Sequence, residues 1–160
     1  MPENASIEVF ELDDIPLFNQ DLENSLPSAV ADLKEKVRSA HAILFVTPEY
    51  NYSVTGVLKN AVDWTSRPFG DNAWVGKPVA IMGASIGTTG TARAQYHLRQ
   101  IFVFLKMYAL NRPEVMISNA PEKFGQEGNV DDGVPKEKIR ELVNELTSWT
   151  IKHQIMQRVV

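Results

Sequence analysis

Two short polar segments carry the residue types that a binding site for an organic ligand needs. The segment Pro48 to Ser53 (PEYNYS) follows the apolar run 42–46, and the segment Ser85 to Gly90 (SIGTTG) follows the apolar run 78–84. Tyrosine offers aromatic surface, asparagine both a donor and an acceptor, and glycine a backbone that can be approached closely. Because the end of an apolar run does not by itself require these residue types, we interpret both segments as parts of a site.

The two apolar runs must position these segments. Residues 42–46 (AILFV) and 78–84 (PVAIMGA) show no alternation of polar and apolar residues, which is typical of strands that helices cover on both faces. We predict parallel strands in both places, with 42–46 in the centre of a sheet. Two shorter strands are expected at 6–11 and 114–117. Apolar residues at helical spacing predict helices at residues 27–40, 56–66, 92–110 and 136–157.

This alternation of strands and helices predicts an α/β fold with a mostly parallel sheet and helices on both faces. The 160 residues suit one domain spanning 1–160. In such sheets ligands lie outside the carboxyl ends of the strands. We therefore expect the loops 48–56 and 85–90 to lie side by side and to form the site.

Composition excludes several classes of function. A net charge of −4 without a cluster of Lys and Arg argues against a nucleic-acid partner. The absence of cysteine excludes disulfides, thiolate metal sites and thiol catalysis, and agrees with a cytoplasmic location. The most apolar stretch, Ile101 to Leu105, lies between Arg99 and Lys106. It is far shorter than the roughly 20 residues of a membrane span, so we expect no membrane partner.

Two longer stretches closely resemble the NADPH-dependent FMN reductases, the flavodoxin-like reductases of quinones, azo compounds and chromate. They are PEYNYSVTGVLKNAVDW and GKPVAIMGASIGTTGTARAQYHLR, and the resemblance extends from Ile7 to the C-terminal helix. It implies a flavodoxin-like three-layer sandwich that binds FMN and uses NADPH or NADH as co-substrate. Hydride would pass from nicotinamide through the flavin to quinones, azo compounds or similar acceptors. The family also implies a homodimer or homotetramer.

The resemblance also implies which residues hold the flavin ring and ribityl chain. They are Pro48, Glu49, Tyr50, Asn51, Gly83, Ala84, Ser85 and Gly87. Gly83, Gly87 and Gly90 would let the backbone pass close to the planar ligand. No catalytic side chain is expected, because the cofactor supplies the chemistry. No metal is expected either, because the three histidines lack the spacing of metal ligands.

The chain departs from the family at its N-terminus. Members begin with a strand, a phosphate loop of the form G-S-x-R-x-x-S-x-N and a first helix, all before the position of Ile7. We expect this first strand and helix to be missing here, and FMN to bind weakly because charge-assisted hydrogen bonds contribute about 1.5 to 3 kcal/mol each. The alternative function is that of a flavin-poor truncated relative with an assembly or binding role.

A serine hydrolase is a further, less favoured alternative. Residues 83–87 (GASIG) fit the G-x-S-x-G nucleophile elbow, with Asp131 or Asp132 and then His153 following in the required order. An elbow needs a helix directly after its serine, whereas Thr88 to Gly90 prolong the loop. His153 also falls within a predicted helix.

The third predicted helix carries a belt of apolar residues. Ile101 to Leu105 are consecutive, so at about 100° per residue they point all around the helix. We favour a subunit interface over deep burial as the explanation. Polar contacts there are expected from Arg93, Tyr96, Arg99 and Glu114.

Overall fold

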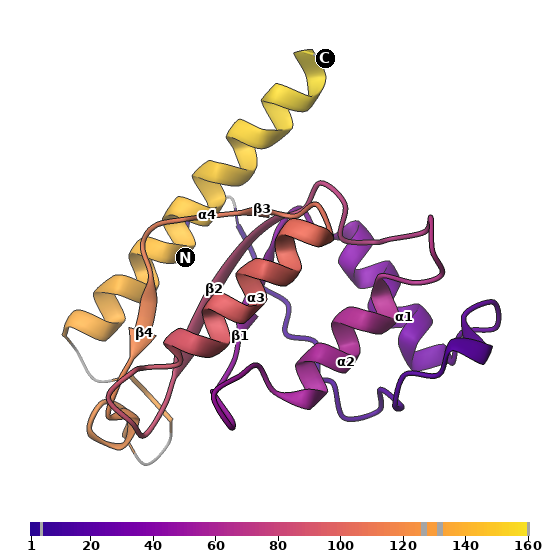
Figure 1. The fold of residues 1–160 in the computed structure, drawn as a ribbon. Helices are drawn as coiled ribbons and strands as arrows, with labels where there is room; N and C mark the ends of the chain where they lie inside the picture. Colours follow the sequence, from indigo (N-terminus) through magenta and orange to yellow (C-terminus); the bar gives the residue numbers. More distant parts are fainter. Residues whose placement is uncertain (4, 126–127, 131–132, 160) are drawn as a thin grey trace.

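The computed structural model describes residues 1–3, 5–125, 128–130 and 133–159, the last three of them by their backbone alone. The elements of this part of the chain alternate between helix and strand (Figure 1). In order, they are the short 3₁₀ helix η1 (Gln20–Leu22), α1 (Ser28–Ser39), β1 (Ile43–Val46), α2 (Gly56–Thr65), β2 (Pro78–Ala84), α3 (Ala92–Phe104), β3 (Tyr108–Ala109), β4 (Val115–Ile117), the 3₁₀ helix η2 (Ala120–Glu122) and α4 (Val134–Val159).

The sheet is parallel, as predicted, and β2 is its central strand. All four residues of β1 pair with Val79 to Met82 of β2, and β2 also pairs with β3 at its start and with β4 at its end. The prediction of a central strand at 42–46 is wrong for the described residues, in which β1 pairs with β2 alone. The last residue of β1, Val46, is 60% exposed. Pattern alone could not distinguish the two strands, because both are apolar throughout.

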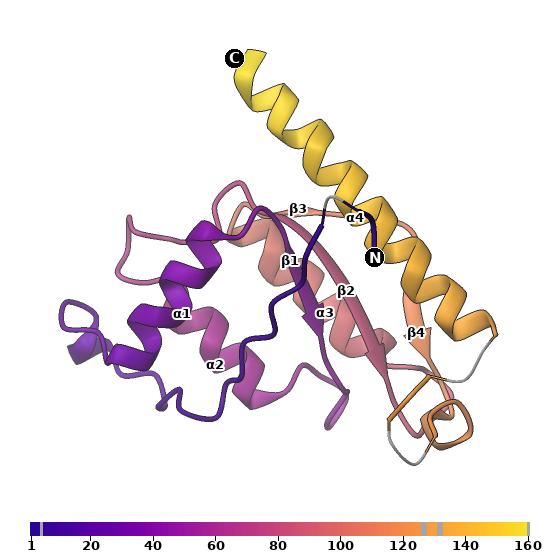
Figure 2. The same ribbon diagram turned by 180° about the vertical axis from the view of Figure 1, so that it is seen from behind.

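Helices cover both faces of the sheet and complete three layers. In Figure 1 α3 lies in front of β2, and in the reverse view of Figure 2 α4 lies in front of the strands. Alternate residues of β2 serve the two faces. Val79 and Ile81 belong to the core under α1, α2 and α3, whereas Ala80 belongs to the core under α4. This arrangement confirms the α/β sandwich.

Helix α2 begins where the first polar loop ends. Thr55 caps it by accepting a hydrogen bond from the amide of Leu58. Trp64 is fully buried and donates from its indole nitrogen to the carbonyl of Pro16, at 2.8 Å. Val57, in the first turn of this helix, is 59% exposed.

Two predicted elements differ in the structure. Residues 6–11 form no strand; Phe10 and Leu12 pack against the core while Val9 is 75% exposed. Ile7 is also 54% exposed, so the alternation in this segment marks neither a strand nor a face buried against the core.

Helix α3 ends at Phe104 instead of Leu110. Lys106 takes a left-handed φ of 59°, which a helix cannot continue through. The chain then returns to the sheet, where the amide of Tyr108 donates to the carbonyl of Lys77 at 2.8 Å. Pairing with β2 thus replaces the last turns of the predicted helix. Among the described residues, no helix is long and apolar enough to cross a membrane.

Candidate functional site

The two polar loops lie side by side, as the sequence predicts. β1 and β2 are parallel and in register, with Val46 opposite Met82. Directly beyond this pair the amide of Thr47 donates to the carbonyl of Met82, at 3.1 Å. The carboxyl ends of β1, β2 and β4 all lie at the lower edge in Figure 1. Both loops therefore leave the sheet at one edge.

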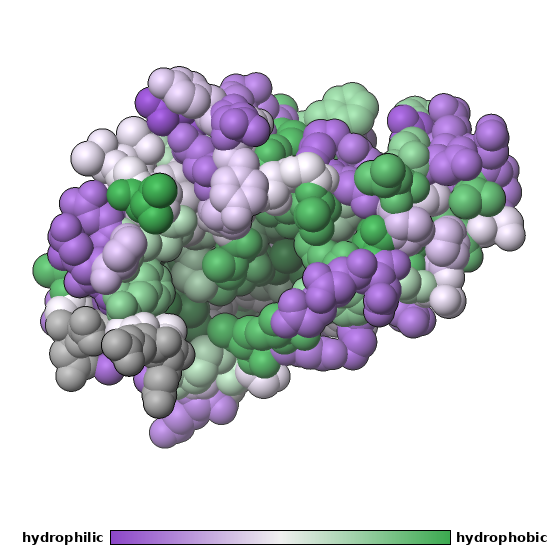
Figure 3. All heavy atoms as spheres, turned by 90° about the horizontal axis from the view of Figure 1, so that it is seen from below, coloured by the Kyte–Doolittle hydropathy of each residue, from purple (hydrophilic) through white to green (hydrophobic). Residues whose placement is uncertain are grey.

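This carboxyl edge is hollowed. Seen from below, the surface has a depression lined by apolar side chains between more polar rims (Figure 3). Two apolar residues of this edge, Val46 and Ile86, are 60% and 83% exposed. Exposed apolar surface at the carboxyl ends of parallel strands is where such folds bind a flat organic ligand.

Glu49 joins the first loop to helix α3. Its Oε2 accepts hydrogen bonds from the amides of Arg93 and Ala94, at 2.9 and 3.2 Å. Its Oε1 accepts a third from Arg93 Nη1, at 3.0 Å. The N-cap residue of α3, Thr91, makes no side-chain cap of its own. The carboxylate of Glu49 thus caps a helix that begins more than forty residues further along the chain.

The ionisation of Glu49 is stabilised by these bonds. Burial by itself would raise the pKa of this carboxyl. The hydrogen bonds from Arg93 and from the amides of Ala94 and Arg93, together with the charge of Arg93, outweigh burial and hold the pKa below its ordinary value. Both oxygens of this carboxylate bind groups of α3, so the side chain fixes the first loop against this helix.

The residues after Glu49 form a tight turn that we call the site turn (Tyr50–Ser53). Tyr50 and Ser53 exchange two backbone hydrogen bonds, at 3.2 and 3.0 Å. Between them Asn51 and Tyr52 have φ angles of 50° and 68°, the pair of left-handed residues that a type I′ turn requires. The rings of Tyr50 and Tyr52 are 65% and 69% exposed. The turn therefore presents aromatic surface and an amide to a ligand.

The second loop is supported by a third segment that the sequence analysis did not assign to the site. The amide of Ser85 donates to the carbonyl of Ile117, and the amides of Asn119 and Ala120 donate to the carbonyls of Gly87 and Ser85, at 2.9 to 3.2 Å. This segment follows β4, another parallel strand. Applying the rule on carboxyl ends to the strand predicted at 114–117 would have found it.

Gly83 near the end of β2 and Gly87 and Gly90 in the second loop are glycines for different structural reasons. A Cβ on Gly83 would lie 2.3 Å from both the carbonyl oxygen of Thr47 and Oγ1 of Thr91. A Cβ on Gly90, whose φ is +57°, would lie 2.6 Å from the backbone of Met116. Close packing of the protein against itself therefore explains Gly83 and Gly90. Our sequence interpretation, room for a ligand, fits only Gly87, which has no neighbouring atom within 4 Å of the Cβ position.

The remaining predicted site residues lie on the same edge. Pro48 is exposed at the end of β1, and Ala84 is the last residue of β2. Ser85 donates from its Oγ to the carbonyl of Gly87, at 3.3 Å.

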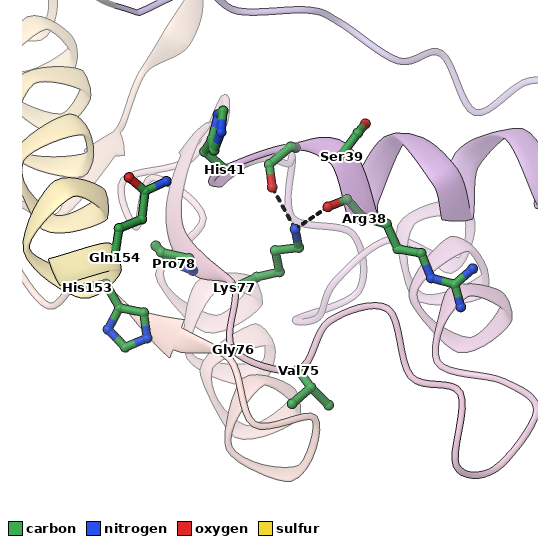
Figure 4. A pocket seen from close by; sticks show the side chains of 10 residues that line it. Arg38, Ser39, His41, Val75, Gly76, Lys77, Pro78, His153 and Gln154 are labelled. Carbon is green, nitrogen blue, oxygen red and sulfur yellow. Dashed lines mark hydrogen bonds between the residues drawn. The ribbon is translucent and has the colours of Figure 1, made fainter. Parts of the chain in front are cut away.

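The serine hydrolase arrangement is not formed. His153 lies beside Lys77 and Pro78, at the start of β2 (Figure 4), whereas Ser85 follows its end. Seven strand residues, about 20 Å, separate the two places. His153 packs on the ring of Tyr108, with ring centroids 3.9 Å apart. The two aspartates proposed as partners, Asp131 and Asp132, lie outside the described residues.

The hollow at the opposite edge of the sheet, beside the start of β2, is lined by a lysine with a structural role. Lys77 donates from its Nζ to the carbonyls of Arg38 and Ala40, at 2.7 and 2.6 Å, and Figure 4 shows both bonds. These carbonyls end helix α1, where a positive charge is favourable. Burial lowers the pKa of Lys77.

Comparison with known proteins gives consistent matches. The model of a family described as NADPH-dependent FMN reductase matches residues 1–122. The chain is 50% identical over 150 residues to the NAD(P)H-dependent FMN reductase PA1204 of Pseudomonas aeruginosa, covering 93% of this chain and 80% of that protein. It is 43% identical over 152 residues to the NADPH:quinone oxidoreductase of Arabidopsis thaliana, covering 92% and 76%.

A solved structure agrees with these matches. FerB of Paracoccus denitrificans, a flavoenzyme NAD(P)H:(acceptor) oxidoreductase, superposes with a TM-score of 0.81 at 36% identity. The match covers 89% of this chain and 78% of FerB.

Proposed function

The chain belongs to the family of NADPH-dependent FMN reductases and is an FMN-dependent NAD(P)H oxidoreductase, and from this premise we propose that its flavin lies at the carboxyl edge of the sheet. The site turn and the loop 85–90 flank it there. The observation that carries this proposal is the capping of α3 by Glu49, which fixes the first loop directly beside the helix into which the second loop runs. The two loops are thereby held as one preformed edge.

The residues at this edge fit a flavin. The exposed rings of Tyr50 and Tyr52 and the apolar hollow suit its flat ring system. Asn51 is exposed and offers a donor and an acceptor to a polar ring edge. The open space at Gly87 admits a close approach of the ribityl chain. FMN would supply the redox chemistry by accepting hydride from NAD(P)H and releasing it to an acceptor.

The protein's own part is to bind and orient. The flavin-binding residues are the set that the family resemblance implies: Pro48, Glu49, Tyr50, Asn51, Gly83, Ala84, Ser85 and Gly87. Within it the side chain of Glu49 holds the loop, and Gly83 allows β1 and α3 to approach β2. Position and electrostatics, rather than a titrating side chain, are what this site provides.

Quinones are the acceptors that we favour. The Arabidopsis relative is named for quinone reduction, and an open edge with exposed aromatic and apolar side chains suits a flat, uncharged acceptor. Azo compounds are the second class. NADPH oxidation measured with a benzoquinone and with an azo dye ranks the two, and faster turnover of the dye would contradict the preference for quinones.

We further propose that the protein is a homodimer or homotetramer assembled through α3. Phe102 is 1% exposed in the core, whereas Val103 and Phe104 are 80% and 82% exposed. The apolar belt therefore does point to both sides of the helix. Its exposed residues, Val103 and Phe104, would be buried by contact with a second copy of the chain. All four residues from which we expected polar contacts have partners within the chain: Tyr96 donates to Glu114, Arg99 to the carbonyl of Leu110, and Arg93 to Glu49. A cytoplasmic location agrees with the absence of cysteine.

Titration with FMN, followed by quenching of flavin fluorescence, tests the site. Asn51→Ala removes the amide and Ser85→Trp fills the edge, so each is expected to weaken FMN binding by about tenfold or more, the worth of a lost hydrogen bond or of a steric block. His41→Ala, at the opposite edge, is the control. Unchanged affinity in both site variants, with a normal circular dichroism spectrum, would contradict the proposed position.

A further inference from the structure

The site turn holds a backbone conformation that its sequence does not favour. Asn51 and Tyr52 are both left-handed, with φ angles of 50° and 68°. Asparagine tolerates this region, but an aromatic residue such as Tyr52 rarely adopts it. Such conformations persist only where the surrounding structure holds them. The turn therefore needs support from elsewhere in the fold.

That support comes from one face of α3. The guanidinium carbon of Arg93 lies 3.9 Å from the centroid of the Tyr52 ring. One helical turn further, His97 Nδ1 is hydrogen-bonded to Ser53 Oγ at 2.9 Å. Residues four apart on a helix project from the same face. Arg93 and His97 therefore hold two consecutive residues of the turn.

Arg93 also holds the residue that precedes the turn. Its Nη1 donates to Glu49 Oε1 at 3.0 Å, while its amide donates to Glu49 Oε2 at 2.9 Å. The guanidinium thus bridges the anchored carboxylate and the ring of Tyr52. Contacts from α3 consequently bracket the left-handed pair on both sides, at Glu49 before it and at Ser53 after it.

We propose that Arg93 and His97 are positioning residues that keep the site turn in its left-handed form, the form in which it meets the flavin. Neither contacts the ligand; Arg93 acts through Tyr52 and Glu49, and His97 acts through Ser53. The proposal rests on the proposed function, because it assumes that the turn borders the flavin. The shape of the turn is then explained by residues of a different element, helix α3.

A double-mutant cycle tests the role of Arg93. Arg93→Gln is expected to weaken FMN binding by about fivefold, the worth of one exposed cation–π contact. Tyr52→Gly converts the turn to Asn-Gly, which adopts the left-handed pair unaided. In that background Arg93→Gln still removes the bond to Glu49 but no longer affects the left-handed pair, so it should weaken binding by less than about twofold. An equal loss in both backgrounds, or no loss in the wild-type background, overturns the proposal.

The role of His97 is tested by a conservative rescue. His97→Ala removes the partner of Ser53 and is expected to weaken FMN binding by about fivefold, the worth of one hydrogen bond. His97→Asn restores a short side chain that can donate or accept this hydrogen bond, and it should recover most of the affinity. Loss in both variants, or in neither, contradicts a positioning role through Ser53. His97 is exposed, so these variants retain the fold.

Two further variants separate the possible failures. Arg99→Gln on the same helix is the matched control, since Arg99 donates to the carbonyl of Leu110, away from the turn, and FMN affinity should not change. Asn51→Ala tests the site itself. If Asn51→Ala weakens binding while Arg93→Gln and His97→Ala do not, the positioning role is wrong and the site stands. If all three leave the affinity unchanged, the proposed site is wrong.

Discussion

The carboxylate of Glu49 caps helix α3 by accepting hydrogen bonds from the amides of Arg93 and Ala94. This contact replaces the side-chain cap that Thr91 does not make. It also joins a loop that follows β1 to a helix that follows β2, so the two halves of the candidate site cannot move independently. The stability of the helix and the placing of the first loop therefore share one side chain.

Removing that cap is expected to destabilise the protein. Glu49→Ala should lower the free energy of unfolding by about 2 to 3 kcal/mol, because both a helix cap and charge-assisted hydrogen bonds are lost. Urea denaturation measures the change. Glu35→Ala, an exposed acidic residue on α1, is the control and should change stability by less than about 0.5 kcal/mol. Equal stability of the two variants would refute the role of Glu49.

The same carboxylate predicts a loss of stability in acid. Because the pKa of Glu49 is lowered in the folded protein, its contribution is complete above the ordinary Glu pKa, about 4.3. That contribution disappears as the pH falls through the lower folded value. The pKa of Asp71 is also lowered, first by its hydrogen bond from Lys34. Glu49→Gln should therefore make the acid-induced decrease in unfolding free energy shallower without abolishing it, and an unchanged slope would count against this prediction.

The glycines at 83 and 87 should respond differently to alanine. Gly83→Ala places a Cβ against Thr47 and Thr91, and such overpacking typically costs about 1 to 3 kcal/mol. Gly87→Ala meets open space and should leave the unfolding free energy unchanged while weakening FMN binding, if the flavin passes there. Urea denaturation and FMN titration of both variants check the pair. Destabilisation by Gly87→Ala would show that the folded chain itself requires a glycine at this position, and it would contradict the prediction.

The two phenylalanines of α3 separate burial from assembly. Phe102→Glu places a charge in the core and should prevent folding. Phe104→Glu changes an exposed residue and should leave the fold intact while dissociating the oligomer. Light scattering and circular dichroism distinguish the two results. A wild-type mass near 17.9 kDa at micromolar concentration would rule out the proposed assembly.

A comparison of FMN with riboflavin, which lacks the phosphate group, tests whether the predicted site includes a ligand for the phosphate. The residues proposed to hold the cofactor contact its ring and ribityl chain, so FMN and riboflavin should bind this 160-residue chain with affinities within about tenfold of each other. Calorimetric titration with both flavins measures the difference. A much larger advantage for FMN would reveal a phosphate ligand that the proposed set omits.

The sequence by itself determined the architecture and the edge of the sheet at which the two polar loops meet. The run 78–84 is apolar throughout and became β2 with the predicted bounds. The polar loops after the strands at 42–46 and 78–84 had to meet, because parallel strands place their carboxyl ends together. The local pattern is sufficient to predict these strands, because a strand that is buried on both faces is apolar along its whole length.

Only the tertiary structure decided which residues act on one another. The family resemblance implies a flavin-binding role for Glu49, but only the fold shows that its carboxylate binds amides 44 and 45 positions away. Gly83 looked like room for a ligand, but the oxygen atoms of Thr47 and Thr91 occupy that space. The apolar pattern after Phe104 looked helical, but pairing with β2 drew Tyr108 into the sheet. A residue's type limits the bonds it can make, and the fold selects the partner, because contacts between distant segments exist only once the chain is packed.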